Sequence, residues 1–162
     1  MEMIIRKVSP EDLDRVTEVE AECFPTAEAA GREALKQRIE TFPENFFVAE
    51  KDRKVIGFIN GCVTDERTIC DEMYEDSRFH HPEGSFQSIF GLDVIPEQRR
   101  QGVAEQLMRK MIEEARVQGK KGLILTCKSR LIHYYEKFGY VNCGVSKSVH
   151  GNAVWYDMIL EF

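Results

Sequence analysis

The stretch 92–104, Leu-Asp-Val-Ile-Pro-Glu-Gln-Arg-Arg-Gln-Gly-Val-Ala, constrains the fold of this chain more than any other. Its apolar, β-branched start predicts a strand, which a short polar turn joins to a helix that begins at Gly102. The first turn of such a helix has backbone N–H groups without acceptors and carries partial positive charge, so it attracts anions. The small residues Gly102 and Ala104 let phosphate oxygens approach the main chain. The stretch therefore predicts a pyrophosphate site, with charge-assisted hydrogen bonds from Arg99 and Arg100; a plain turn with solvated arginines is the alternative.

Two motifs in this order resemble the hallmarks of the GCN5-related N-acetyltransferase (GNAT) superfamily. The first is the Arg-x-x-Gly-x-Ala run of 99–104, which is similar to the acetyl-CoA signature of that superfamily. The second is the run 134–140, Tyr-Tyr-Glu-Lys-Phe-Gly-Tyr. From 22–25 to 155–156, the chain further resembles bacterial members of the arylalkylamine N-acetyltransferase branch. The resemblance implies an acetyl-CoA-dependent N-acetyltransferase.

The resemblance also implies a GNAT fold of the mixed α/β class, in one domain over 1–162. Such a fold has a central, mostly antiparallel, twisted sheet of six to seven strands with a splayed parallel pair, flanked by about four helices. Residue patterns place the strands at 3–8, 46–51, 55–64, 86–95, 122–127, 140–147 and 153–161. They place the helices from 9 to about 23 and over 27–41, 102–118 and 131–138. The strand 86–95 is expected to splay from 122–127 and admit the pantetheine arm.

Acetyl-CoA is the cofactor, as a co-substrate, that the resemblance implies. The residues it assigns to acetyl-CoA are Leu92, Asp93, Val94, Arg99, Arg100, Gln101, Gly102, Val103, Ala104, Glu105 and Ser129. Main-chain groups around Leu92 and Val94 are expected to bond the pantetheine amides, whereas the side chains of both residues are expected core residues in any case. The five cysteines include no close pair, so we expect reduced thiols and no metal site.

The implied chemistry is attack of an amine on a thioester. An alkylamine with a pKa of about 10.4 is protonated at neutral pH and must lose a proton before it attacks. The departing thiolate then needs a proton donor, and a tyrosine hydroxyl suits that task. The resemblance assigns this role to Tyr135, because Tyr134 occupies the adjacent aromatic position of the motif. The alternative is that Tyr135 packs with its hydroxyl at the surface.

The general base does not follow from the resemblance. Animal members of the arylalkylamine branch place two histidines where this chain has Ser88 and Phe90, and neither of these can accept the proton. The remaining candidates are a relay of waters and the side chains of His80, His81, Glu72 and Glu75. We favour a water relay with His80 as its terminal group.

The acceptor site is expected near 65–83, a segment with seven carboxylates and two arginines. An acidic lining would favour a cationic amine, although a solvated acidic face is the alternative. Aromatic residues could wall an apolar acceptor pocket or belong to the core; these are Phe24, Phe42, Phe79, Phe86 and Phe90. We expect direct acetyl transfer in a ternary complex to a primary amine of a small molecule, aryl alkyl amines included. A peptide or protein N-acetyltransferase and a non-catalytic CoA-binding regulatory module are the alternatives.

Charge and hydropathy exclude other partners. The net charge is −6, and no basic patch with interleaved aromatics suggests nucleic-acid binding. No apolar run approaches the roughly 20 residues that cross a bilayer, and the start of the chain lacks a signal-peptide pattern. We therefore expect a cytoplasmic protein that binds neither nucleic acid nor membrane. The terminal run 153–162 is apolar enough to pair with a second copy in a homodimer or to form a buried strand of the monomer.

Overall fold

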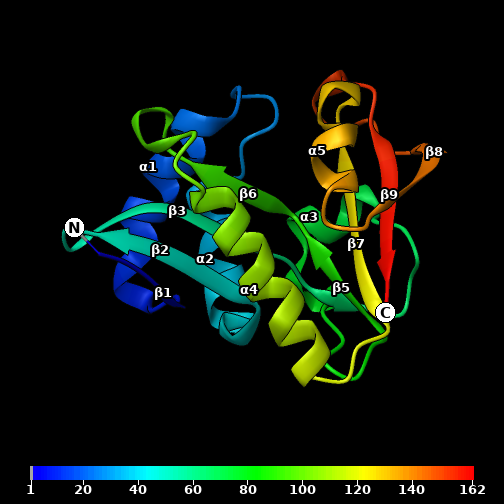
Figure 1. Ribbon diagram of the computed structural model, residues 1–162, viewed down its shortest axis with the longest axis horizontal. Helices are drawn as coiled ribbons and strands as arrows, with labels where there is room; N and C mark the ends of the chain where they lie inside the picture. The colour runs from blue at the N-terminus through cyan, green and yellow to red at the C-terminus, as the bar shows by residue number, and fades with distance from the viewer. Residues whose placement is uncertain (1) are drawn as a thin grey trace.

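The computed structural model describes residues 2–162 as two hydrogen-bonded sheets flanked by helices, so residue 1 of the expected domain lies outside the described part (Figure 1). The first sheet has the order β1-β2-β3-β6, with bounds Met3–Lys7, Phe46–Lys51, Lys54–Asn60 and Gly91–Val94. The second has the order β4-β5-β7-β9-β8, with bounds Val63–Thr64, Phe86–Ile89, Gly122–Cys127, Tyr156–Glu161 and Val141–Val145. The mixed α/β class and the mostly antiparallel pairing are confirmed.

Two expected strands are each divided, which is why residues 2–162 form nine strands instead of seven. The expected strand 55–64 is broken between β3 and β4, and the expected strand 86–95 is broken at Phe90 between β5 and β6. At the first break, an added Cβ on Gly61 would collide with the carbonyl oxygen of Ser88. At the second break, Phe90 N donates to Asn60 O at 2.7 Å, and Gly91 is also paired with Asn60. Two residues of one strand therefore lie opposite one residue of the other, as in a β-bulge.

The expected splay of the parallel pair is present. β5 pairs with β7 in parallel, from Phe86 opposite Gly122 to Ile89 opposite Leu125. β6 instead pairs antiparallel with β3. The chain therefore leaves β7 after Ile89 and joins the other sheet, which separates the directions of β6 and β7.

Five α-helices are present within residues 2–162: α1 Leu13–Cys23, α2 Arg32–Thr41, α3 Asp71–Glu75, α4 Val103–Val117 and α5 Ile132–Glu136. In Figure 1, α4 crosses one face of the first sheet, and α1 and α2 lie on the other face. The apolar face of α4 is buried, with Leu107, Met108 and Met111 at 0–1% exposure. The short helix α3 was not expected, because Met73 is its one buried residue and gives no periodic apolar pattern. No helix in the described residues is long and apolar enough to span a membrane.

The close approach at Gly61 gives a stability prediction. We expect Gly61→Ala to lower the free energy of unfolding by about 2 kcal/mol or more, because the new methyl group overlaps the Ser88 carbonyl oxygen. Urea denaturation measures the change. Gly31→Ala is the matched control, since an added Cβ there meets nothing within 4 Å, and it should change stability by less than about 1 kcal/mol. Equal effects of the two substitutions would contradict the prediction.

Candidate functional site

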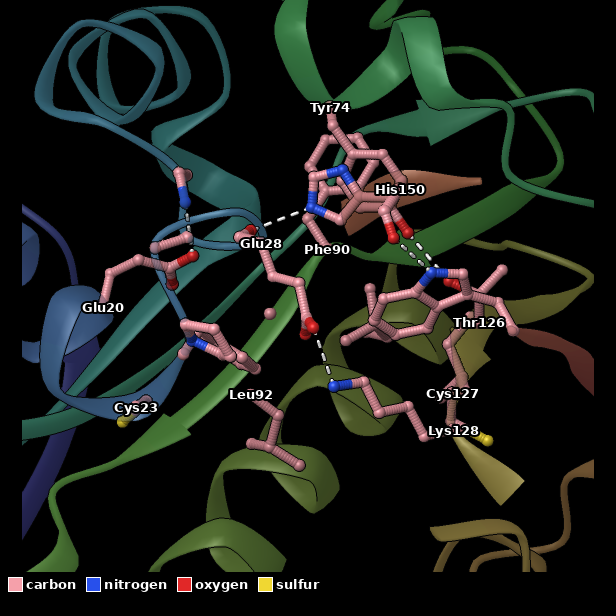
Figure 2. Close-up of a pocket in the computed structure, with 18 of the residues that line it drawn as sticks. Glu20, Cys23, Glu28, Tyr74, Phe90, Leu92, Thr126, Cys127, Lys128 and His150 are labelled. Carbon is pink, nitrogen blue, oxygen red and sulfur yellow. Dashed lines mark hydrogen bonds and ion pairs between the residues drawn. The ribbon is translucent and has the colours of Figure 1, made fainter. Parts of the chain in front are cut away.

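A cavity of about 460 Å³ opens where β6 and β7 separate (Figure 2). One side of its lining comes from α1, α2 and the segment 24–31 between them. The other side comes from the ends of β6 and β7, from α3 and α5, and from residues that precede β9. Within the 86–95 strand, β5 pairs with β7 but β6 does not, and the chamber lies between the two sheets where this pairing ends.

Among the described residues, no strand pairs with the edge of β6 that faces the gap. Ile95 N donates to Ile56 O at 2.9 Å, which continues the hydrogen bonds between β3 and β6. In an antiparallel pair, every second residue turns its main-chain N–H and C=O toward the partner strand. The N–H and C=O groups of Leu92 and Val94 therefore point away from β3. Val94 O shows this direction, since it accepts from Arg99 Nε at 2.9 Å and from Cys23 Sγ at 3.3 Å. An extended molecule with amide groups could add to this edge as a further strand would.

The start of α4 provides an anion site beside that edge. Gly102 adopts φ +81, and an added Cβ would meet nothing within 4 Å. The first hydrogen bond of the helix runs from Gln106 N to Gly102 O, so the N–H groups of 103–105 have no acceptor within the helix. Arg100 is exposed with φ +65, whereas Arg99 is held by Val94 O. Backbone N–H groups, the helix dipole and Arg100 could together hold a pyrophosphate.

Other residues assigned to acetyl-CoA lie farther from this edge. Asp93 has its main chain on the β3 side and its side chain fully buried, so it offers no group to the open edge. The carboxylate of Glu105 bonds Arg109 at 2.9 Å along the exposed face of α4. Gln101 is exposed in the turn before the helix, and Ser129 is exposed in the turn after β7.

Tyr135 lies at the cavity, and His80 does not. The phenol of Tyr135 lines the cavity, is 9% exposed, and has a pKa raised by burial, so it is protonated at neutral pH and able to donate. The ring of His80 packs on Phe42 at 5.1 Å, and its Nδ1 accepts from Val63 N at 3.0 Å. His80 is not among the lining residues, and burial lowers its pKa.

The other residues predicted for the acceptor site also divide into those that line the cavity and those that do not. Phe24, Phe90 and Glu75 line the cavity. Phe42 and Phe86 are buried in a core cluster, and Phe79 is exposed. Ser88 is fully buried and donates to Cys62 O at 2.8 Å. His81 and Glu72 are outside the lining of the cavity.

Sequence reasoning named Phe24 and Phe90 but missed the other aromatic residues of the cavity wall, Tyr74, His150 and Trp155. The Tyr74 hydroxyl is 2.8 Å from Thr126 Oγ1, and its ring stacks on His150 at 5.1 Å and tilts against Phe90 at 5.0 Å. Trp155 Nε1 donates to His150 O at 2.8 Å. These residues come from three distant parts of the chain, so no local pattern could have grouped them (Figure 2).

The segment 24–31 is tied to the opposite wall by two contacts. His150 Nε2 lies 2.8 Å from Glu28 O, and Lys128 Nζ forms an ion pair with Glu28 Oε2 at 2.8 Å. The Lys128 ammonium also lies 5.6 Å from the centre of the Trp155 ring. The cavity is therefore bridged on the side that faces the α1–α2 segment (Figure 2).

Residues 13–140 match the family model described as Acetyltransferase (GNAT) family. The chain belongs to the GNAT family. This confirms the resemblance that the two sequence motifs carry. The cavity, the open edge of β6 and the start of α4 are accordingly features of a GNAT domain.

Comparison with known proteins supports the assignment. A probable hydrolase, YhcX, from Bacillus subtilis (strain 168) is 29% identical over 142 residues, which cover 82% of this chain and 27% of that protein. Human N-acetyltransferase 8 is 30% identical over 104 residues, 62% of this chain and 40% of that protein. The chain thus spans less than half the length of either relative. The structure of the GNAT-like decarboxylase GphF in complex with isobutyryl-CoA matches with a TM-score of 0.85 at 19% identity over 98% of each chain, which confirms the fold.

The two glycines that flank α4 provide a test of the anion site. Gly102 and Gly119 both have positive φ, at +81 and +76, and both have open space around the position of a Cβ. Alanine at either position should cost about 1 kcal/mol of backbone strain, measured as a lower Tm. We expect only Gly102→Ala to weaken acetyl-CoA binding, by about tenfold in calorimetric titration, because its methyl group obstructs the approach of phosphate. Equal Kd values for the two variants would contradict an anion site at this turn.

Proposed function

We propose that this GNAT domain transfers an acetyl group from acetyl-CoA to the primary amine of a small molecule, by direct attack in a ternary complex. The observation that carries the proposal is a cavity whose lining includes both Leu92 of β6 and residues of α1. Acetyl-CoA supplies the acetyl group as a thioester. The chain has to bind both substrates, hold the amine close to the thioester and move two protons.

The edge of β6 and the start of α4 suit the pantetheine arm and the pyrophosphate of CoA. Main-chain groups of Leu92 and the N–H of Val94 can bond the pantetheine amides, since Val94 O already accepts from Arg99 and Cys23. The N–H groups of 103–105 can bond the pyrophosphate. Tyr135 suits the donation of a phenolic proton to the departing sulfur, because it is buried, protonated and in the cavity wall.

Two contacts join the opposite walls of the chamber, and this closure favours a small acceptor over a peptide. The contacts of Glu28 with His150 and Lys128 join its two walls at 2.8 Å each. A volume of about 460 Å³ lies within the range of small-molecule sites, roughly 300–1,000 Å³. The aromatic rings of Tyr74, Phe90 and Trp155 provide apolar walls, which suit an amine with an aryl or alkyl body.

Tyr135→Phe tests the role of the hydroxyl. We expect kcat for thiol release from acetyl-CoA to fall about 100-fold, because the leaving sulfur loses its proton donor, while the Kd of acetyl-CoA stays the same. Tyr134→Phe is the matched control, since Tyr134 is the neighbouring ring of the same helix and is not among the lining residues. A Tyr135→Phe enzyme with wild-type kcat would contradict the proposed role.

The substrate class is tested with thiol release across aryl alkylamines, polyamines, amino acids and short peptides. Turnover of a small amine with a higher kcat/KM than any peptide supports the proposal. Turnover of peptides alone would select a peptide N-acetyltransferase. Tight binding of acetyl-CoA without turnover of any amine would select a CoA-binding module, and failure to bind acetyl-CoA would reject both.

A further inference from the structure

Four polar side chains form a buried cluster at the inner end of the cavity. They are Glu20 of α1, Arg38 of α2, Asn60 of β3 and Asp93 of β6, and their exposed fractions are 5%, 5%, 0% and 0%. Within residues 2–162, five of their atoms lack a hydrogen-bond partner: Glu20 Oε1, Arg38 Nε, Asn60 Nδ2 and both Asp93 carboxyl oxygens. An unsatisfied buried polar group costs about 1–3 kcal/mol, so such a concentration points to a ligand or a proton that these atoms share.

Three of these groups converge on the space beside Gly91, which itself lines the cavity. A Cβ placed on Gly91 would lie 2.9 Å from Asp93 Oδ1, 3.6 Å from Asn60 Nδ2 and 3.7 Å from Glu20 Oε1. These are distances at which a nitrogen or oxygen atom can interact with polar groups. The absence of a side chain at Gly91 therefore leaves a polar recess that opens into the chamber.

The carboxyl group of Glu20 affects the charge of the neighbouring Asp93 carboxyl group. Burial, together with the charge of Glu20, raises the pKa of Asp93 well above its ordinary value, which favours the protonated form of Asp93. Cys23 lies on the same side and raises the pKa further, and Arg38 opposes the shift. Burial raises the pKa of Tyr74 to about 12, so this neighbour is neutral. Of the two carboxyl groups at the recess, Glu20 is therefore better suited than Asp93 to bind a cation.

The recess is adjacent to the expected position of the thioester. Gly91 precedes Leu92, whose main chain faces the open edge of β6. A Cβ on Gly91 would lie near Glu20 of α1 and near Asp93, so Gly91 and Asp93 face α1. Because side chains alternate along a strand, Leu92 and Val94 face the opposite side. An amine that enters from the α1 side would meet Glu20 before it reaches a thioester bound along β6.

We propose that Glu20 binds the ammonium group of the acceptor and takes its proton, and that Asp93 and Asn60 position the Glu20 carboxylate. This role rests on the proposed acetyltransferase function. One N–H bond of the ammonium breaks and the proton passes to Glu20, which leaves an electron pair on nitrogen. That pair forms the C–N bond to the acetyl carbon as the C–S bond breaks, and the sulfur leaves with its electrons. Tyr135 donates its phenolic proton to the sulfur, which becomes a thiol. The nitrogen then gives a second proton to the Tyr135 phenolate, and Glu20 releases its proton to water.

Other carboxylates at the cavity suit this role less well. Glu28 is neutralised by Lys128 at 2.8 Å and belongs to the bridge between the walls. Glu75 lines the cavity from α3 and has no part in the cluster beside Gly91. Glu20 Oε2 is fixed by Ala30 N at 2.8 Å, which leaves Oε1 directed at the recess. Glu20 thus combines a fixed orientation with a free acceptor atom.

Glu20→Gln tests the role with two acceptors of the same shape. Phenethylamine is protonated at neutral pH, whereas its isostere O-benzylhydroxylamine is not. We expect Glu20→Gln to lower kcat/KM for phenethylamine about 100-fold or more and for O-benzylhydroxylamine less than about fivefold, because the second acceptor needs no base before attack. Glu22→Gln, at an exposed position of the same helix, should change neither value. Acetyl-CoA affinity and Tm are measured for both variants, and Glu20→Asp should restore part of the lost activity.

The results of these measurements distinguish a failure of the role proposed for Glu20 from a failure of the proposed acetyltransferase function. Equal losses for the two acceptors would make Glu20 a structural residue and overturn the role. Unchanged kcat/KM would also overturn it and leave the acetyltransferase function standing. A wild-type protein that binds acetyl-CoA but turns over no amine would overturn both.

A spectroscopic measurement tests the shared proton even if Glu20→Gln does not fold. Infrared spectra of the wild-type protein at neutral pH should contain the carbonyl stretch of a protonated carboxyl group, and this band should be lost in Asp93→Asn. A wild-type spectrum without the band, or an Asp93→Asn spectrum that retains it, would overturn the pairing of Asp93 with Glu20.

Discussion

The site of this protein depends on a strand edge that loses its hydrogen-bonded neighbour. One edge of the segment 86–94 pairs with β4 and then with β3, whereas the other edge pairs with β7 only as far as Ile89. β6 therefore has an edge without a strand partner, β7 diverges from it, and the cavity occupies the space between them. An unpaired strand edge buried within a protein is unfavourable unless another group bonds it. The loss of one strand partner thus creates both a space for a ligand and main-chain groups that could bind it.

The elements of the fold could be predicted because their signals are local. The apolar repeat of α4, the glycine at its start and the bounds of β2 and β7 each lie within a short stretch of sequence. The division of the strand 86–95 could not be predicted, because alternation identifies a strand but not its partner. The five-residue helix α3 lacked a pattern for a similar reason, since one buried residue defines no period.

The sequence motif and the cavity wall differ in how local they are. The residues predicted to bind CoA lie mostly in one continuous segment, from Leu92 to Glu105, so a short motif describes them. The wall of the cavity depends on contacts such as Glu28 with His150, which are 122 residues apart. One signal was available in the sequence: Asp93 is a carboxylate inside an apolar, β-branched run, and a charge at such a position requires a buried partner. That partner, Glu20, is 73 residues away and was identifiable only from the structure.

The register of β6 against β3, next to the bulge at Phe90, determines which side chains of β6 turn toward α1. With Phe90 and Gly91 both opposite Asn60, Gly91 and Asp93 turn toward α1, and Leu92 and Val94 turn away from it. A shift of one residue in a strand exchanges its two faces. A shift of β6 by one residue against β3 would bring a leucine to the buried acidic cluster and an aspartate to the apolar side, so the register of one four-residue strand decides which face of β6 carries the buried carboxyl group.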